Sequence, residues 1–319
     1  MANAAIYATR GRLNAYPDRH ATRVRRRLAD RHDVAPEQIV LGNGAAELLQ
    51  SAAHVLLGPG DELVTPWPSY PLYPLMAARA GGRAVAVDAA GGRADPGAIR
   101  ELIGERTRVL TICNPNDPTG DYLPAESLGE LLSTLPEDVH VLLDEALIHF
   151  QDADSANGSV GLVEAFPRLL VFRTFSKIYG LSGLRAGYVV GSPTAAALLE
   201  SLAPALGVNS PTQAGIEQAL RIGDGEVERR RELVIGQRGR LERELHALPV
   251  DAPPSQANFL WLSAAGVTGA ELAARLEHSG VIVAPGGPLG ADDHVRASIR
   301  GPAASERLLS ALRDALAQA

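Results

Sequence analysis

A hydroxyl, an amine and a guanidinium lie close together in the stretch Arg173–Gly187. Ser176 and Lys177 stand side by side, and Arg185 follows eight residues after the lysine. The glycines of this stretch let the backbone pass close to a ligand. The amine of Lys177 can form an imine with an aldehyde, and Ser176 with Arg185 can hold a phosphate. These residues therefore suit the binding of a phosphorylated carbonyl compound.

Short apolar strands must position this group and two further acidic residues. Three apolar runs predict buried strands, at 109–113, 139–143 and 169–172. Asp117, Asp144 and Lys177 each follow the end of one of these runs. In a parallel sheet flanked by helices, ligands gather at the carboxyl ends of the strands. We therefore expect the three side chains to face one common site.

The order of elements predicts an α/β chain with two domains. Residues 17–207 alternate strands and helices, which indicates a large domain with a mostly parallel sheet flanked by helices. Residues 208–319 predict an interdomain helix, interrupted at 223–225, and a small α+β domain. The small domain is expected to contain strands 258–262, 281–284 and 294–299 with helices 268–279 and 304–317. Residues 1–16 show little periodicity and form the expected N-terminal arm.

Four ordered motifs together resemble one family of enzymes. Alone, the lysine stretch is equally compatible with a solvated surface charge, but it is preceded by the segments Gly42–Glu47, Asn114–Gly120 and Asp144–Ala146. In this order the motifs resemble the pyridoxal-phosphate (PLP) aminotransferases of fold type I, class I/II. The likeness is strongest to the histidinol-phosphate aminotransferase branch, which also holds the threonine-phosphate decarboxylases. It runs from about Leu13 to the C-terminus.

The resemblance implies a role for each catalytic candidate. Lys177 would hold pyridoxal 5'-phosphate as a Schiff base and then act as the general base. Asp144 would pair with the pyridine nitrogen and keep it protonated, and Tyr70 would stack on the ring. The cofactor phosphate would be bound by Tyr16 of the neighbouring subunit together with Gly44, Ala45, Ala46, Thr174, Ser176 and Arg185. A homodimer with shared active sites is therefore expected.

The substrate end of the expected site departs from the family pattern. Arg296 matches the arginine that grips the substrate carboxylate through two parallel hydrogen bonds, with Arg300 as a lesser rival. Asp117 is expected to contact both cofactor and substrate, but it stands where the family has an asparagine that donates to the cofactor's phenolic oxygen. Leu147 replaces a tyrosine that is a second donor. Ala284 stands where histidinol-phosphate enzymes have an arginine for the substrate phosphate.

Composition limits the classes of function. The chain has 319 residues, of which 46% are hydrophobic, and a net charge of −7. This charge argues against a nucleic-acid partner. No apolar run approaches the roughly 20 residues that span a bilayer, and Met1–Ile6 lacks the features of a secretion signal. The single cysteine, Cys113, fits a reducing compartment, so we expect a cytoplasmic protein, and no metal site is predicted.

Three functions remain open on the sequence. The leading one is a PLP-dependent aminotransferase that moves an amino group between an α-amino acid, or a histidinol-phosphate-like amine, and a 2-oxo acid. The second is a PLP-dependent decarboxylase or lyase, such as one acting on threonine phosphate, because the same cofactor serves both reactions. The third is a PLP-binding protein that has lost activity together with the two donors to the phenolic oxygen.

Overall fold

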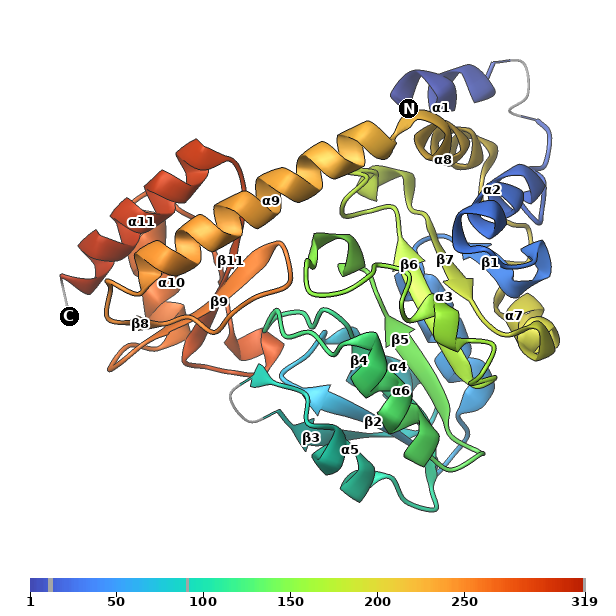
Figure 1. The fold of residues 1–319 in the computed structure, drawn as a ribbon, viewed down its shortest axis with the longest axis horizontal. Helices are drawn as coiled ribbons and strands as arrows, with labels where there is room; N and C mark the ends of the chain where they lie inside the picture. The colour runs from blue at the N-terminus through green and yellow to red at the C-terminus, as the bar shows by residue number, and fades with distance from the viewer. Residues whose placement is uncertain (11–13, 90–91, 318–319) are drawn as a thin grey trace.

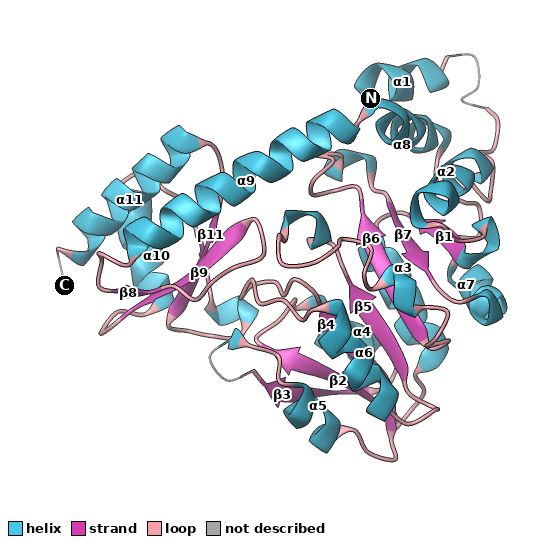
Figure 2. Cartoon of the chain, viewed as in Figure 1, coloured by secondary structure: helices cyan, strands magenta, loops and turns pink. Residues whose placement is uncertain are grey.

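The structure, a computed structural model, describes residues 1–10, 14–89 and 92–317. Leu13, where the resemblance begins, and residues 318–319 of the expected small domain lie outside this part. Figures 1 and 2 show a large sheet with helices around it and a smaller sheet near the C-terminus, joined by the long helix α9 (Asp224–Leu245). None of the helices described has the length and apolar character needed to cross a membrane.

The large sheet is mostly parallel, as the sequence predicts. It has seven strands in the order β1-β7-β6-β5-β4-β2-β3. Only β7 is antiparallel to its neighbours, β1 and β6. The strands are β1 (Ile39–Gly42), β2 (Glu62–Trp67), β3 (Arg83–Asp88), β4 (Thr107–Cys113), β5 (His140–Asp144), β6 (Leu169–Thr174) and β7 (Gly187–Val190). The carboxyl ends of β4, β5 and β6 therefore meet at one edge, where the candidate residues begin.

Helices bury both faces of this sheet. They are α2 (Thr22–His32), α3 (Ala45–Leu56), α4 (Leu72–Arg79), α5 (Pro96–Leu102), α6 (Ala125–Thr134) and α7 (Ala196–Leu202). On β5, Leu142 packs into the cluster that contains α3, α4 and α7, while Val141 and Leu143 pack with α2, α5 and α6. Because both faces are covered, the central strands are continuous apolar runs. Each fully buried leucine contributes roughly 1.5–3 kcal/mol to stability.

The C-terminal unit is an antiparallel sheet of four strands with two covering helices. The sheet has the order β10-β11-β9-β8, and α8 (Ser210–Ile222) precedes α9 with the predicted break at Gly223. The elements are β8 (Val250–Asp251), β9 (Phe259–Ala264), α10 (Gly269–His278), β10 (Ala284–Pro285), β11 (His294–Ser298) and α11 (Pro302–Leu316). Short 3₁₀ turns connect several elements, at 36–38, 148–150, 160–162, 182–184, 193–195 and 287–289.

Two parts of the expected secondary structure were wrong. The predicted strand 281–284 reduces to β10, because the Val281 N–H closes the end of α10 by donating to the Leu276 carbonyl at 2.9 Å and Ile282 is exposed. The N-terminal arm, expected to be irregular, contains the helix α1 (Ala2–Ala8). This helix lies along α8 (Figure 1), so tertiary packing stabilises a segment too short to be helical alone.

A buried polar network surrounds Arg173, a residue of β6. Arg173 is 1% exposed, and its Nε donates to Glu145 Oε2 at 2.8 Å while Nη1 donates to Asn157 Oδ1 at 3.0 Å. His32 Nε2 bonds the Tyr188 hydroxyl at 2.9 Å. Burial, together with the Arg173 charge, lowers the pKa of His32 from 6.5 to about 3. The same two causes, with smaller effects from other nearby cations, lower the pKa of His149 to about 3.

These two histidines should make the protein sensitive to acid. Their folded-state pKa lies below the unfolded value of 6.5, so the stability they provide is complete above pH 6.5 and is lost as pH falls toward 3. At pH 5 each histidine would lower the free energy of unfolding by about 2 kcal/mol relative to its value above pH 6.5. We expect His149→Phe to reduce the loss of unfolding free energy between pH 7 and pH 5 by about this amount, measured by urea unfolding.

The matched control is His54→Gln, which changes an exposed histidine on α3 and should leave the pH dependence as in the wild type. If His149→Phe and the wild type lose the same unfolding free energy over this range, burial of a neutral imidazole is not the cause of the acid sensitivity.

Candidate active site

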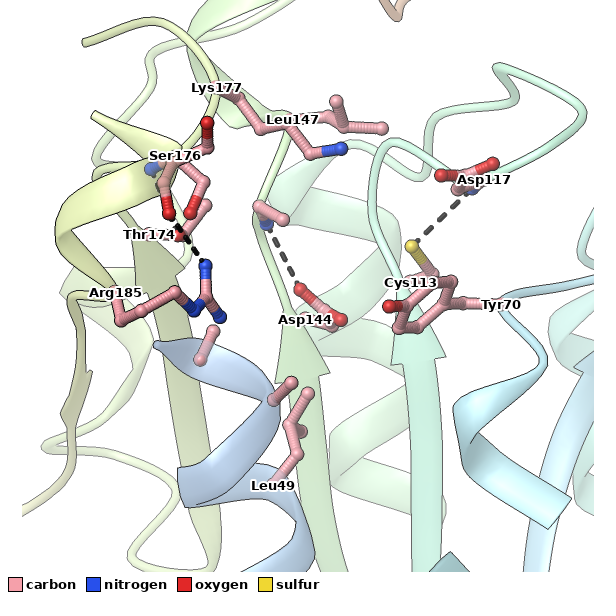
Figure 3. Close-up of a pocket in the computed structure, with 14 residues that line it drawn as sticks. Leu49, Tyr70, Cys113, Asp117, Asp144, Leu147, Thr174, Ser176, Lys177 and Arg185 are labelled. Carbon is pink, nitrogen blue, oxygen red and sulfur yellow. Dashed lines mark hydrogen bonds between the residues drawn. The ribbon is translucent and has the colours of Figure 1, made fainter. Parts of the chain in front are cut away.

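A cavity of about 260 Å³ opens at the carboxyl ends of β4, β5 and β6. The first turn of α3 and the turn after β6 complete its walls (Figure 3). Its lining residues are Ala45, Ala46, Leu49, Tyr70, Cys113, Asp117, Asp144, Ala146, Leu147, Thr174, Ser176, Lys177, Ser182 and Arg185. The structure therefore brings together the side chains predicted to follow the three strands.

Lys177 and Asp144 occupy the middle of the cavity. Figure 3 shows the Lys177 side chain extending across its upper side, with the Asp144 carboxylate below. Asp144 is 5% exposed and accepts hydrogen bonds from the Ala146 N–H at 3.1 Å and the Tyr73 hydroxyl at 3.0 Å. Burial raises the pKa of the Asp144 carboxyl to about 6, although these donors lower it. A cation placed against this carboxylate would favour its ionised form.

Tyr73 is a site residue that the sequence did not reveal. It is fully buried on α4, its hydroxyl holds Asp144, and its ring meets that of Tyr70 edge-on with centroids 5.9 Å apart. Tyr70 itself is 38% exposed and lines the cavity. The only sequence signal for Tyr73 is its position three residues after Tyr70.

One end of the cavity brings together groups that can bind an anion. Thr174, Ser176 and Arg185 gather there (Figure 3), next to the first turn of α3. A helix start presents free backbone N–H groups and the positive end of the helix dipole. Gly44, which precedes α3, has a φ of +101°, and a Cβ there would lie 2.6 Å from Arg185 Nη2. The positive φ favours glycine at this position, and a larger residue would also push the Arg185 guanidinium away from the turn.

The opposite end holds Asp117, Cys113 and the apolar side chain of Leu147. Asp117 donates its backbone N–H to Cys113 Sγ at 3.4 Å (Figure 3). Burial raises the pKa of the Cys113 thiol well above its usual value, so it remains a neutral thiol. Arg296 lies outside the lining residues, but its Nη1 donates to Asp117 Oδ1 at 2.5 Å. The second arginine considered from the sequence, Arg300, is exposed.

The structure does not bring Tyr16 into the cavity of its own chain. Tyr16 is 82% exposed and does not line the cavity. Its expected contact with the cofactor of a neighbouring subunit stays a prediction, as does the homodimer on which it depends. No group of acidic, histidine and cysteine side chains suited to a metal ion occurs among the described residues.

Comparisons with known proteins agree with this architecture. The family model for aminotransferase class I and II matches residues 1–314. An aromatic amino acid aminotransferase of Corynebacterium efficiens is 38% identical over 274 residues, covering 85% of this chain and 77% of that protein. An aromatic amino acid aminotransferase of Mycolicibacterium vanbaalenii is 36% identical over 310 residues, covering 97% of this chain and 87% of that protein.

Two solved structures share the fold over nearly the whole chain. A histidinol-phosphate aminotransferase of Sinorhizobium meliloti in complex with pyridoxal-5'-phosphate aligns with a TM-score of 0.88 and 26% identity, covering 99% of this chain and 87% of that one. Thermus thermophilus aspartate aminotransferase with maleate aligns with a TM-score of 0.84 and 26% identity, covering 98% of this chain and 87% of that one. The chain belongs to the class I and II aminotransferases and is a PLP-dependent enzyme of fold type I.

The cavity fits this cofactor. Its anion-binding end suits the phosphate, and Asp144 is a buried carboxylate whose hydrogen-bond partners are neutral donors, so it can receive a protonated ring nitrogen. Lys177 presents an amine across the cavity from that carboxylate. When bound, PLP reacts with amines through its aldehyde and withdraws electrons from the substrate's α-carbon.

Proposed function

We propose that this enzyme transfers the amino group of an aromatic α-amino acid, or of a closely related amine, to a 2-oxo acid, with Lys177 as the residue that carries the cofactor. The observation that carries the proposal is the placement of Lys177 across the cavity from Asp144, with the anion-binding end beside them. The aromatic preference is supported by the relatives, which are described as aromatic amino acid aminotransferases.

Each side chain then has a definite task. Lys177 moves a proton at the substrate's α-carbon, because it is the amine that reaches into the cavity. Asp144 holds the positive charge of the ring nitrogen, and Tyr73 fixes the orientation of that carboxylate. Tyr70, which lines the cavity, would contact the ring of the cofactor, and Arg296 would receive the substrate carboxylate. The phosphate is held by Thr174, Ser176, Arg185 and the first turn of α3.

A phosphorylated substrate fits less well than an aromatic one. Ala284 pairs with Arg296 in the small sheet, so the position where related enzymes have a phosphate-binding arginine offers only a methyl group. The cavity wall includes the apolar side chains of Leu49 and Leu147. One charge-assisted hydrogen bond is worth about 1.5–3 kcal/mol, or one to two decades in specificity.

A donor panel tests the proposal. We expect L-phenylalanine, L-tyrosine or L-tryptophan with 2-oxoglutarate to give a kcat/KM at least about 10-fold above histidinol phosphate. The released 2-oxo acid and carbon dioxide should both be quantified. Histidinol phosphate as the best donor would overturn the substrate assignment. Release of carbon dioxide without a 2-oxo acid would identify a decarboxylase, and no product from any donor would indicate a PLP-binding protein without activity.

A further inference from the structure

Arg296 and Asp117 form an ion pair that joins the small domain to the cavity. Arg296 lies on β11, and Asp117 follows β4 in the large domain. Their side chains are 27% and 9% exposed, with Nη1 and Oδ1 2.5 Å apart. The guanidinium also lies over the Phe259 ring, 5.1 Å from its centroid. Arg296 Nε is buried and has no hydrogen-bond partner among the described residues.

This pair places a carboxylate where a substrate carboxylate would bind. A planar guanidinium holds a carboxylate best through two parallel N–H donors. Asp117 already accepts from one guanidinium nitrogen of Arg296. Because the Asp117 side chain is nearly buried, water screens its negative charge only weakly. A second carboxylate that approaches Arg296 therefore meets an occupied donor and a repulsive charge.

We infer that Asp117 is a specificity-determining residue, which acts as a resident carboxylate that competes with the carboxylate of the substrate for Arg296. This inference rests on the proposed role of Arg296 in the proposed function. An α-carboxylate ligand must displace Asp117 from the guanidinium or share it, whereas a ligand with an uncharged hydroxyl at this end need not. Asp117 thus weakens the contribution of Arg296 to the binding of the substrate's α-carboxylate.

Two unreactive ligands of matched shape test the inference in the PLP-loaded enzyme. 3-Phenylpropanoate carries the carboxylate, and 3-phenylpropan-1-ol carries a hydroxyl in its place. Their dissociation constants should be measured by calorimetry for the wild type and for Asp117→Asn, which keeps the side-chain shape. We expect the variant to bind the propanoate at least about 10-fold more tightly and the alcohol with unchanged affinity.

A double-mutant cycle shows whether the effect acts through the arginine. In the Arg296→Gln background, Asp117→Asn should no longer change the affinity for the propanoate. The inference is overturned if Asp117→Asn gains no affinity for the propanoate, gains equally for both ligands, or gains as much without Arg296. Because the readout is binding of unreactive ligands, failure of the donor panel leaves this test intact, and failure of this test leaves transamination intact.

Discussion

Replacing Lys177 with alanine should lower kcat for transamination by at least about 10³-fold. The side chain is the proposed general base at the substrate's α-carbon, and such a base contributes roughly 10²–10⁴-fold. The variant would also lose the proposed covalent attachment of the cofactor. Steady-state kinetics with the best aromatic donor measures the effect.

Loss of the fold would not explain such a result, because Lys177 is exposed and its removal leaves the core intact. Circular dichroism and the urea midpoint of PLP-free Lys177→Ala should match those of the PLP-free wild type. A small added amine, such as methylamine, should restore part of the proton transfer. Activity within 10-fold of the wild type would show that another group acts as the base.

Asp144→Asn should lower the activity of the loaded enzyme and raise the stability of the PLP-free protein. We expect kcat to fall by at least about 10²-fold, because in the proposed site the variant would no longer place a negative charge against the ring nitrogen of the cofactor. In the PLP-free protein, burial raises the pKa of Asp144 from 3.8 to about 6. The ionised Asp144 carboxylate therefore lowers the free energy of unfolding, and this loss grows as pH rises from 3.8 through about 6. Removing the charge should therefore raise the unfolding free energy at pH 8, by up to about 3 kcal/mol.

The measurements are kinetics of the loaded enzyme and urea unfolding of the PLP-free enzyme at pH 8. Tyr73→Phe is the matched control, because it removes one donor to Asp144 and keeps the charge. It should lower kcat by about 10-fold, which corresponds to one hydrogen bond. If Asp144→Asn is less stable than the wild type at pH 8, the burial cost assigned to its carboxylate is wrong.

The central part of the site could be predicted because it follows from local patterns. Asp144 and Lys177 come directly after apolar runs, and parallel strands bring such positions together at one edge. Gly44 could be placed because Gly42–Glu47 predicts a glycine-rich turn that opens a helix, whose free N–H groups suit an anion. These features depend on strand periodicity and turn chemistry, which a sequence displays directly.

The remaining features depend on contacts between distant parts of the chain. The hydrogen bond from Tyr73 to Asp144 joins residues 71 positions apart in the sequence, and the one from Arg296 to Asp117 joins residues 179 positions apart. No rule of sequence spacing could therefore pair them. Packing against α8 stabilises the helix α1. Its sequence has no acidic residue in the first turn and no side-chain cap, so it carries no signal for a helix start. The two-residue strands β8 and β10 are too short for an alternating pattern.

Covalent labelling tests the central claim most directly, because Lys177 is the only lysine in the 319 residues. The PLP-loaded enzyme should be reduced with borohydride, digested and mapped by mass spectrometry, with Lys177→Arg treated in parallel. We predict a single phosphopyridoxyl group on Lys177 and none on the variant. A label at any position other than Lys177, or no label on a protein that retains activity, would contradict the assignment of Lys177.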